Sequence, residues 1–134
     1  MSTRKHLGTF FLGWEWVDCF ADPTTSGGHF MFCPDTPARR PEMQVGIDYR
    51  NWWEVLNVAM HEATEHALAR LRCTFTNCQE QVRDTQHIQF HFNHGQFTEA
   101  IGMAAAYLDD VLPLLRAEWE RAEAARKAEG HYEI

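Results

Sequence analysis

The sequence predicts an α+β domain in which a small antiparallel sheet packs against two or three helices. Three observations support this prediction: aromatic and β-branched runs near the N-terminus, two later segments with an apolar period of three to four residues, and one short segment of strict alternation. A chain of 134 residues fits a single hydrophobic core, so residues 1–134 are expected to form one domain, with 129–134 as a flexible tail.

Three strands are expected before the first helix. Residues 8–21 are rich in aromatic and β-branched side chains and predict a strand bent at Gly13. A cluster of turn residues separates it from a second strand at 29–33, and these two strands would pair as a hairpin. Three prolines in 34–42 predict a loop, after which 43–49 provides the third strand.

The first helix is expected to begin after Asn51 and to end near Arg72. Asn51 can cap it, and Glu54 is the matching acid of a capping box. Its apolar residues recur at steps of three or four and so define a core face. They are Trp52, Leu56, Ala59, Ala63, Ala67 and Leu71.

The C-terminal half is expected to contain a loop, a short strand and a second helix. Residues 73–86 show no period, whereas alternation over 87–92 separates an apolar face from a polar one. Asn93 and Gln96 form a second capping box. Pro113 is expected to end or kink the helix that follows, and a charged helix continues beyond it. The apolar residues of the second helix are Phe97, Ile101, Ala104, Leu108, Val111 and Leu115.

Composition excludes several classes of function. The formal net charge is −7 and no basic stripe is present, so a nucleic-acid partner is not expected. No segment approaches the roughly 20 apolar residues of a membrane span, and the N-terminus lacks a signal peptide, so the expected location is cytoplasmic. Four cysteines without metal-site or disulfide-scaffold spacing are expected to be reduced thiols.

The chemistry of the sequence centres on His61-Glu62-Ala63-Thr64-Glu65-His66. Zinc peptidases with the motif His-Glu-x-x-His place two histidines at i and i+4 on one helix face, and the intervening glutamate acts as general base. In this chain the i+4 position is Glu65, and the second histidine comes one residue later. Carboxylate oxygen is an accepted zinc ligand, so His61 with Glu65, or Glu62 with His66, are the two candidate pairs.

Further ligands are available downstream. His87 and His91 share one face of the predicted strand, His94 lies in the next turn, and Glu99 lies early in the second helix. Glu99 shares a face with small residues that would let another helix approach closely. If the His61 helix is the one that approaches, Glu99 would be the third ligand.

These two segments, Val58–Leu68 and His94–Ala104, together resemble the small zinc-metallopeptidase-like proteins of phages and prophages, which are similar in plan to the ImmA/IrrE and SprT peptidase domains. The resemblance covers residues 43–115 and implies a few strands, a His-Glu-x-x-His helix and a later helix that supplies a ligand. Applied to this sequence, it implies His61 as first ligand, Glu62 as general base and Glu99 as third ligand.

The departure from the motif leaves three alternatives. Glu65 replaces the second histidine, or the helix is distorted to admit His66, or the site has lost its metal.

Two functions follow as expectations. The first is a zinc-dependent metallopeptidase-like hydrolase that acts on a protein substrate, and its ligands are drawn from His61, Glu65, His66, His94 and Glu99. The second is a non-catalytic protein-binding inhibitor or regulator, located in the host cytoplasm if phage-encoded, for which several exposed tryptophans would provide the partner-binding patch.

Overall fold

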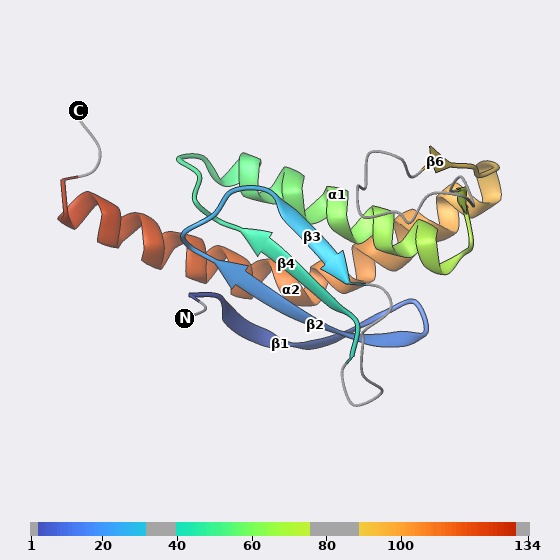
Figure 1. Cartoon of the computed structure of the whole chain (residues 1–134), viewed down its shortest axis with the longest axis horizontal. Helices are drawn as coiled ribbons and strands as arrows, with labels where there is room; N and C mark the ends of the chain where they lie inside the picture. The colour runs from blue at the N-terminus through green and yellow to red at the C-terminus, as the bar shows by residue number, and fades with distance from the viewer. Residues whose placement is uncertain (1–2, 32–39, 76–88, 131–134) are drawn as a thin grey trace.

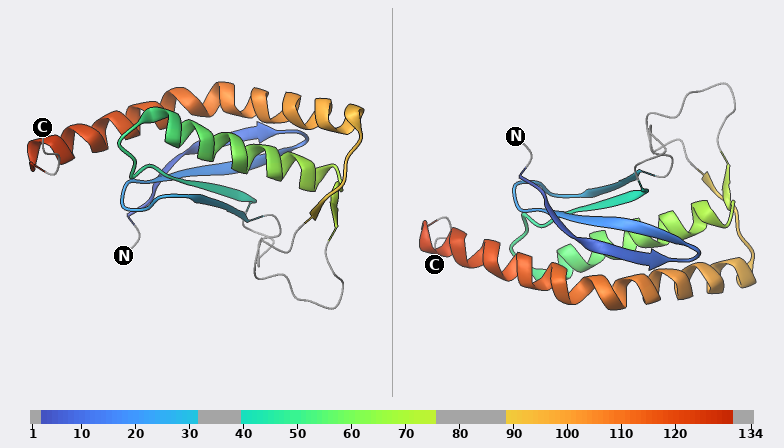
Figure 2. Two further views of the ribbon diagram at one scale, coloured as in Figure 1. Left: turned by 90° about the horizontal axis from the view of Figure 1, so that it is seen from above. Right: turned by 90° about the horizontal axis from the view of Figure 1, so that it is seen from below.

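The computed structural model describes residues 3–31, 40–75 and 89–130. Four strands, β1 (Lys5–Leu12), β2 (Glu15–Asp22), β3 (Gly28–Met31) and β4 (Glu42–Gly46), form one sheet in the order β1-β2-β4-β3. Two helices, α1 (Trp52–Arg70) and α2 (His94–Ala128), pack on one face of this sheet and run antiparallel to each other (Figures 1 and 2). The short strands β5 (Thr74–Phe75) and β6 (Gln89–Phe90) pair separately. The α+β class is therefore confirmed.

The sheet is mixed rather than antiparallel throughout. β1 and β2 pair antiparallel, as do β3 and β4, but β2 and β4 run parallel. The predicted hairpin between 8–21 and 29–33 is wrong, because β4 inserts between β2 and β3. The chain after Asp22 crosses the end of β4, where the Gly46 amide donates to the Gly27 carbonyl over 2.7 Å.

Residues 8–21 form two strands instead of one bent strand. Gly13 has a φ of 67°, a conformation that glycine adopts readily, and with Trp14 it makes a two-residue turn between Leu12 and Glu15. A Cβ at Gly13 would lie 2.2 Å from the Met103 side chain, so this turn also packs closely on α2. The aromatic run is thus a tight β1–β2 hairpin.

Both predicted capping boxes are present. The Asn51 amide donates to the Glu54 carboxylate over 3.3 Å at the start of α1. At the start of α2, the Gln96 amide donates to the Asn93 side chain over 2.8 Å, and the Asn93 amide donates to the Gln96 side chain over 2.9 Å. These local bonds satisfy amides that a helix N-terminus leaves without intrahelical acceptors.

The helix α2 does not end at Pro113 and continues to Ala128, so the predicted second segment is part of the same helix. Val111 and Leu115 are fully buried on either side of the proline. Their packing holds both halves in helical conformation despite the missing amide hydrogen.

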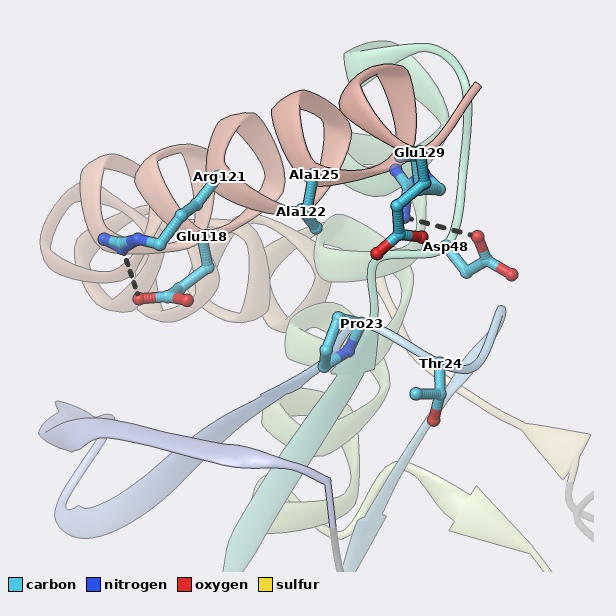
Figure 3. A pocket seen from close by; sticks show the side chains of 9 residues that line it. Pro23, Thr24, Asp48, Glu118, Arg121, Ala122, Ala125 and Glu129 are labelled. Atoms are coloured by element: carbon cyan, nitrogen blue, oxygen red, sulfur yellow. Dashed lines mark hydrogen bonds and ion pairs between the residues drawn. The ribbon is translucent and has the colours of Figure 1, made fainter. Parts of the chain in front are cut away.

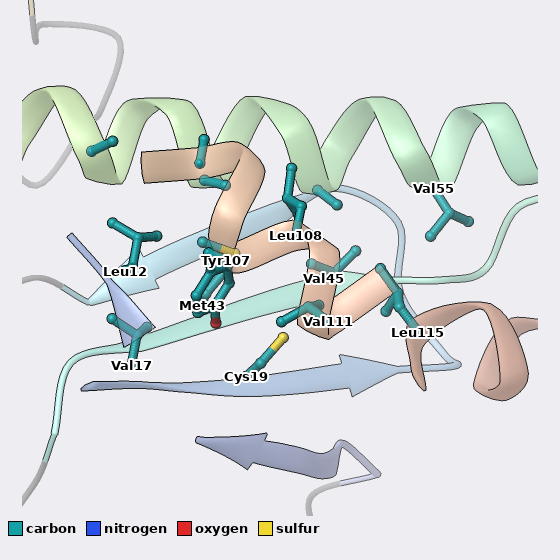
Figure 4. Packing of buried hydrophobic residues seen from close by; sticks show 14 of the residues in the cluster. Leu12, Val17, Cys19, Met43, Val45, Val55, Tyr107, Leu108, Val111 and Leu115 are labelled. Carbon is teal, nitrogen blue, oxygen red and sulfur yellow. The ribbon is translucent and has the colours of Figure 1, made fainter. Parts of the chain in front are cut away.

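The core lies between the sheet and the two helices (Figure 4). The middle of the predicted α1 face, Ala59, Ala63 and Ala67, is buried as expected. Phe97 and Ile101 at the start of α2 are exposed, because the core contacts of α2 begin at Ala100 and continue toward its C-terminus. The large core side chains come from all layers: Leu12, Val17, Met43, Val45, Val55, Tyr107, Leu108, Val111 and Leu115.

Cys19 and Cys73 are buried free thiols. Burial raises the pKa of the Cys19 thiol to about 12, which makes it a poor nucleophile. Cys33, Cys78, most of the predicted loops at 34–42 and 73–86, and the end of the predicted tail, 131–134, lie outside the described residues. At the start of the second loop the prediction is wrong, because Thr74–Phe75 forms the strand β5. In the described part of the chain, neither helix combines the length and the apolar character needed to cross a lipid bilayer.

Candidate metal centre

The central part of α1 carries the predicted site. One side of this helix packs on the sheet through Val55, Ala59 and Ala63. Since each residue advances about 100° around a helix, His61 and Glu65 then lie on the side away from that core face. Glu62 lies between the two faces, and β3 covers it.

The structure brings three potential ligands together. One ligand atom each from His61, Glu62 and Glu65 lies within 4.8 Å of the other two. His61 Nε2 is 3.1 Å from Glu65 Oε1, so the i, i+4 pair forms without any distortion of the helix. The side chains of His61 and Glu65 are 60% and 26% exposed, and both can be reached from solvent.

Glu62 has a different environment from its neighbours. It is buried, and a Cβ added to Gly28 of β3 would lie 3.0 Å from Glu62 Cγ and 2.9 Å from Val58 Cγ1. The absence of a side chain at Gly28 thus lets the edge strand β3 lie directly on the Glu62 side chain. Burial, followed by the nearby negative charge of Glu65, raises the pKa of Glu62 to about 7, and His61 opposes this shift.

His66 belongs to another cluster. Its ring is fully buried, lies 5.3 Å from the Phe30 ring, and has Nε2 2.9 Å from Glu15 Oε1. Arg70 Nε also donates to this Glu15 oxygen. Burial lowers the pKa of His66, although the Glu15 carboxylate opposes the shift. Of the two residues considered for the second position, Glu65 is the one that lies beside His61.

His94 and Glu99 are exposed and lie outside the His61 cluster. The expected approach of α1 to the Glu99 face of α2 does not occur, because α2 turns Ala100, Ala104 and Val111 toward the core. Gly102, one turn from Glu99, has no atom within 4 Å of an added Cβ. The role of His94 and Glu99 as ligands stays a prediction.

The predicted strand 87–92 is shorter in the structure, where Gln89–Phe90 forms β6 and the next two residues are not in a strand, and this segment lies beside the cluster. His87 lies outside the described residues, and His91 is exposed. Phe90 and Phe92 line a groove of about 360 Å³ together with Met60 and Leu68. The same groove is lined by His61, Glu65, Asn57 and Thr64. The candidate ligands therefore border a partly apolar depression that a side chain of a bound molecule could enter.

A larger depression of about 550 Å³ lies elsewhere, between the C-terminal part of α2 and the loops after β2 and β4 (Figure 3). Four of its charged groups pair with one another: Arg121 with Glu118 over 3.2 Å, and Arg126 with Asp48 over 3.4 Å. It contains none of the predicted site residues, and this internal pairing gives no indication of a ligand.

Sequence reasoning missed Glu15 and the apolar wall of the groove. Glu15 is 51 positions from His66, and no local pattern signals a contact of that range. The fold and site together define a two-layer α+β protein with a His-Glu-Glu cluster on its first helix. No protein-family model, no curated protein and no solved structure compared with this chain matches it.

Proposed function

We propose that this protein is a zinc-dependent hydrolase that acts on a protein or peptide substrate at the His61 cluster. The observation that carries the proposal is the convergence of one imidazole and two carboxylates within 4.8 Å. Histidine nitrogen and carboxylate oxygen are both common zinc ligands, with bonds of about 2.0–2.2 Å, so donors at this mutual spacing fit a shared ion after small side-chain movements. A zinc ion held there would supply Lewis-acid activation of water and of a carbonyl group.

The roles of the side chains follow from their environments. His61, which is exposed, and Glu65, which is partly exposed, line the groove and would hold the ion. Glu62, with a pKa of about 7, can accept and return a proton near neutral pH, which is what a general base requires. The apolar side chains of Phe90 and Phe92 would contact the substrate beside the ion.

Metal analysis tests this proposal. We expect about one zinc ion per chain after zinc loading and dialysis, measured by inductively coupled plasma mass spectrometry. His61→Ala and Glu65→Ala should each weaken zinc binding by at least about tenfold, since each removes one of few ligands. His6→Ala is the matched control. His6 pairs with Asp18 on the sheet, so the His6→Ala variant should bind zinc as the parent does. A parent protein that binds no zinc would exclude the proposal.

Glu62→Gln separates the two roles open to Glu62. A general base lost from a hydrolase lowers turnover by about 10²–10⁴-fold while zinc stays bound, whereas a lost ligand lowers zinc affinity itself. Zinc titration and peptide hydrolysis, measured on the same preparation, therefore distinguish a base from a ligand. Ala variants of His94 and Glu99 test in the same titration whether α2 supplies a further ligand.

A second candidate function, non-catalytic protein binding, is favoured by a different observation. Trp14 and Trp16 are 55% and 56% exposed on the β1–β2 hairpin, and Phe11 is 44% exposed beside them. The Phe11 and Trp16 rings meet edge to face with centroids 5.1 Å apart. Glu15 ties this hairpin to α1 through His66 and Arg70, which fixes the backbone that carries the three rings, called here the hairpin cluster. Rigid, exposed aromatic groups are typical of binding hot spots.

Exchange of the hairpin cluster tests the second candidate. If the hairpin cluster binds a partner protein, the immobilised parent chain and the His61→Ala variant should both retain that protein, whereas the Trp14→Ser/Trp16→Ser variant should not. The affinity of the tryptophan variant should fall by at least about tenfold, because exposed tryptophans at interface centres contribute about 2 kcal/mol or more. Interferometry with the partner identified by mass spectrometry gives the affinities. Equal binding by the tryptophan variant would argue against the hairpin cluster.

A further inference from the structure

The two helices carry more apolar surface than the sheet covers. Trp53 and Met60 of α1 are 64% and 51% exposed, and Ile101 of α2 is 42% exposed. Apolar residues of α1 at 53, 56 and 60 and of α2 at 101, 105, 108 and 112 follow the three-to-four-residue spacing of a second helix-packing stripe. These residues lie where α1 and α2 meet and also reach solvent. Such an apolar stripe is expected where further helices pack on the two helices.

A groove follows the contact between the two helices. It has a volume of about 420 Å³, and all of its lining residues belong to α1 or α2. Its apolar lining consists of Trp52, Leu56, Leu108, Leu112 and Pro113. Asp109 and Arg116 complete it, and we call this surface the helix groove.

The charges of the helix groove are arranged so that it can bind a copy of itself. Asp109 and Arg116 are exposed and lie seven residues apart, or about 10 Å along α2 at 1.5 Å per residue. A two-fold axis perpendicular to α2 at Leu112–Pro113 would place Asp109 of each chain opposite Arg116 of the other. Within its own chain, Arg116 pairs with Glu120 over 2.8 Å and stacks on Trp52, with 5.0 Å from the guanidinium carbon to the ring centroid, so it is held at the edge of the groove.

The geometry points to a second copy of this chain as the occupant: we propose an isologous dimer in which the helix grooves of two copies meet antiparallel. A two-fold interface needs one self-complementary patch, and an acid and a base symmetric about its centre meet that requirement. The two Asp109–Arg116 contacts between the chains also fix the antiparallel register of the two α2 helices.

Part of the apolar area of a dimer interface lies beside the helix groove. Trp53 and Ile101 are 64% and 42% exposed, and an aromatic side chain presents about 150–250 Å² when fully accessible, so together with the partly exposed groove residues they present roughly 300 Å² of apolar surface per chain. A standard interface buries about 800 Å² per partner, of which roughly 60% is apolar, or on the order of 500 Å². This surface therefore supplies more than half of the apolar area of a standard interface.

Sedimentation equilibrium with charge-swapped variants tests the proposal on the full chain. The parent protein should have twice the 15.6 kDa mass of one chain. Asp109→Arg and Arg116→Asp should each raise the dimer dissociation constant by at least about tenfold, because each places like charges opposite one another twice. The double variant Asp109→Arg/Arg116→Asp again places an acid opposite a base at both ends of the groove. Its dimer dissociation constant should therefore lie within roughly threefold of that of the parent.

Asp110→Arg is the matched control. It makes the same change of charge one position further along α2, about 100° around the helix and away from the groove, so it should leave the dimer unchanged. Circular dichroism confirms that each variant keeps its helical content. A parent chain that stays monomeric at about 0.5 mM, far above the micromolar dissociation constants of stable complexes, would overturn the proposal. A double variant that stays as weak as the single variants would also overturn it.

Discussion

Replacing Glu15 with alanine is expected to lower the free energy of unfolding by about 3 kcal/mol. Glu15 accepts hydrogen bonds from two groups of α1, the fully buried His66 ring and the Arg70 guanidinium. Without Glu15, the His66 ring and the Arg70 guanidinium stay largely out of water but lose this carboxylate partner. Breaking a fully buried ion pair in this way lowers the free energy of unfolding by about 3–5 kcal/mol. The value expected here is at the lower end, because the Glu15 side chain is 17% exposed. Urea unfolding at pH 7 measures the loss.

Glu65→Ala provides the matched control for the Glu15 experiment. It also removes a carboxylate from a histidine of α1, at a similar distance of 3.1 Å, but the His61 side chain is 60% exposed, whereas that of His66 is fully buried. Exposed ion pairs contribute between 0 and about 1 kcal/mol, so the loss should be small. Equal losses for the two variants would show that the Glu15 cluster does not join the hairpin to α1 as the contacts indicate.

The elements of the fold could be predicted because their signals are local. Apolar spacing and the capping boxes at Asn51 and Asn93 lie within a few residues of the helices they define. Strand order has no such signal, since the insertion of β4 between β2 and β3 depends on pairing between distant segments. The hairpin at Gly13 has a local cause, a positive φ, but a glycine in a strand pattern is equally compatible with a bend.

The candidate site divides in the same way. The closeness of His61 and Glu65 follows from helix geometry alone and could be expected from four-residue spacing. The separation of His66 from them depends on Glu15, which reaches α1 from another layer. The outward position of Glu99 depends on which side of α2 the sheet occupies, and a helix with small residues on more than one side does not specify this.

Glu62 makes the stability of the fold depend on pH in a direction that is unusual for a carboxyl group. Its pKa rises from 4.5 to about 7 on folding, so the folded state favours the protonated form. The contribution of the protonated Glu62 to the free energy of unfolding is therefore fully present below pH 4.5. It decreases as pH rises, because the unfolded chain releases the proton near pH 4.5 while the folded chain still holds it, and it is lost as pH rises through 7. At 1.36 kcal/mol per pKa unit, the full change is about 3 kcal/mol.

Glu62→Gln should therefore be about as stable as the parent near pH 4.5 and up to about 3 kcal/mol more stable at pH 8, since glutamine keeps a neutral group of the same size beneath Gly28. Urea unfolding in the absence of metal, at pH 4.5 and pH 8, gives the difference between the two proteins. His66 has a pKa that is lowered on folding and favours stability at higher pH, but it is common to both proteins and cancels in this difference. Glu99→Gln, a change of the same kind at an exposed position, should give no such difference. A Glu62→Gln curve parallel to that of the parent would mean that Glu62 stays ionised in the fold, and its assignment as a base that exchanges a proton near neutral pH would then be wrong.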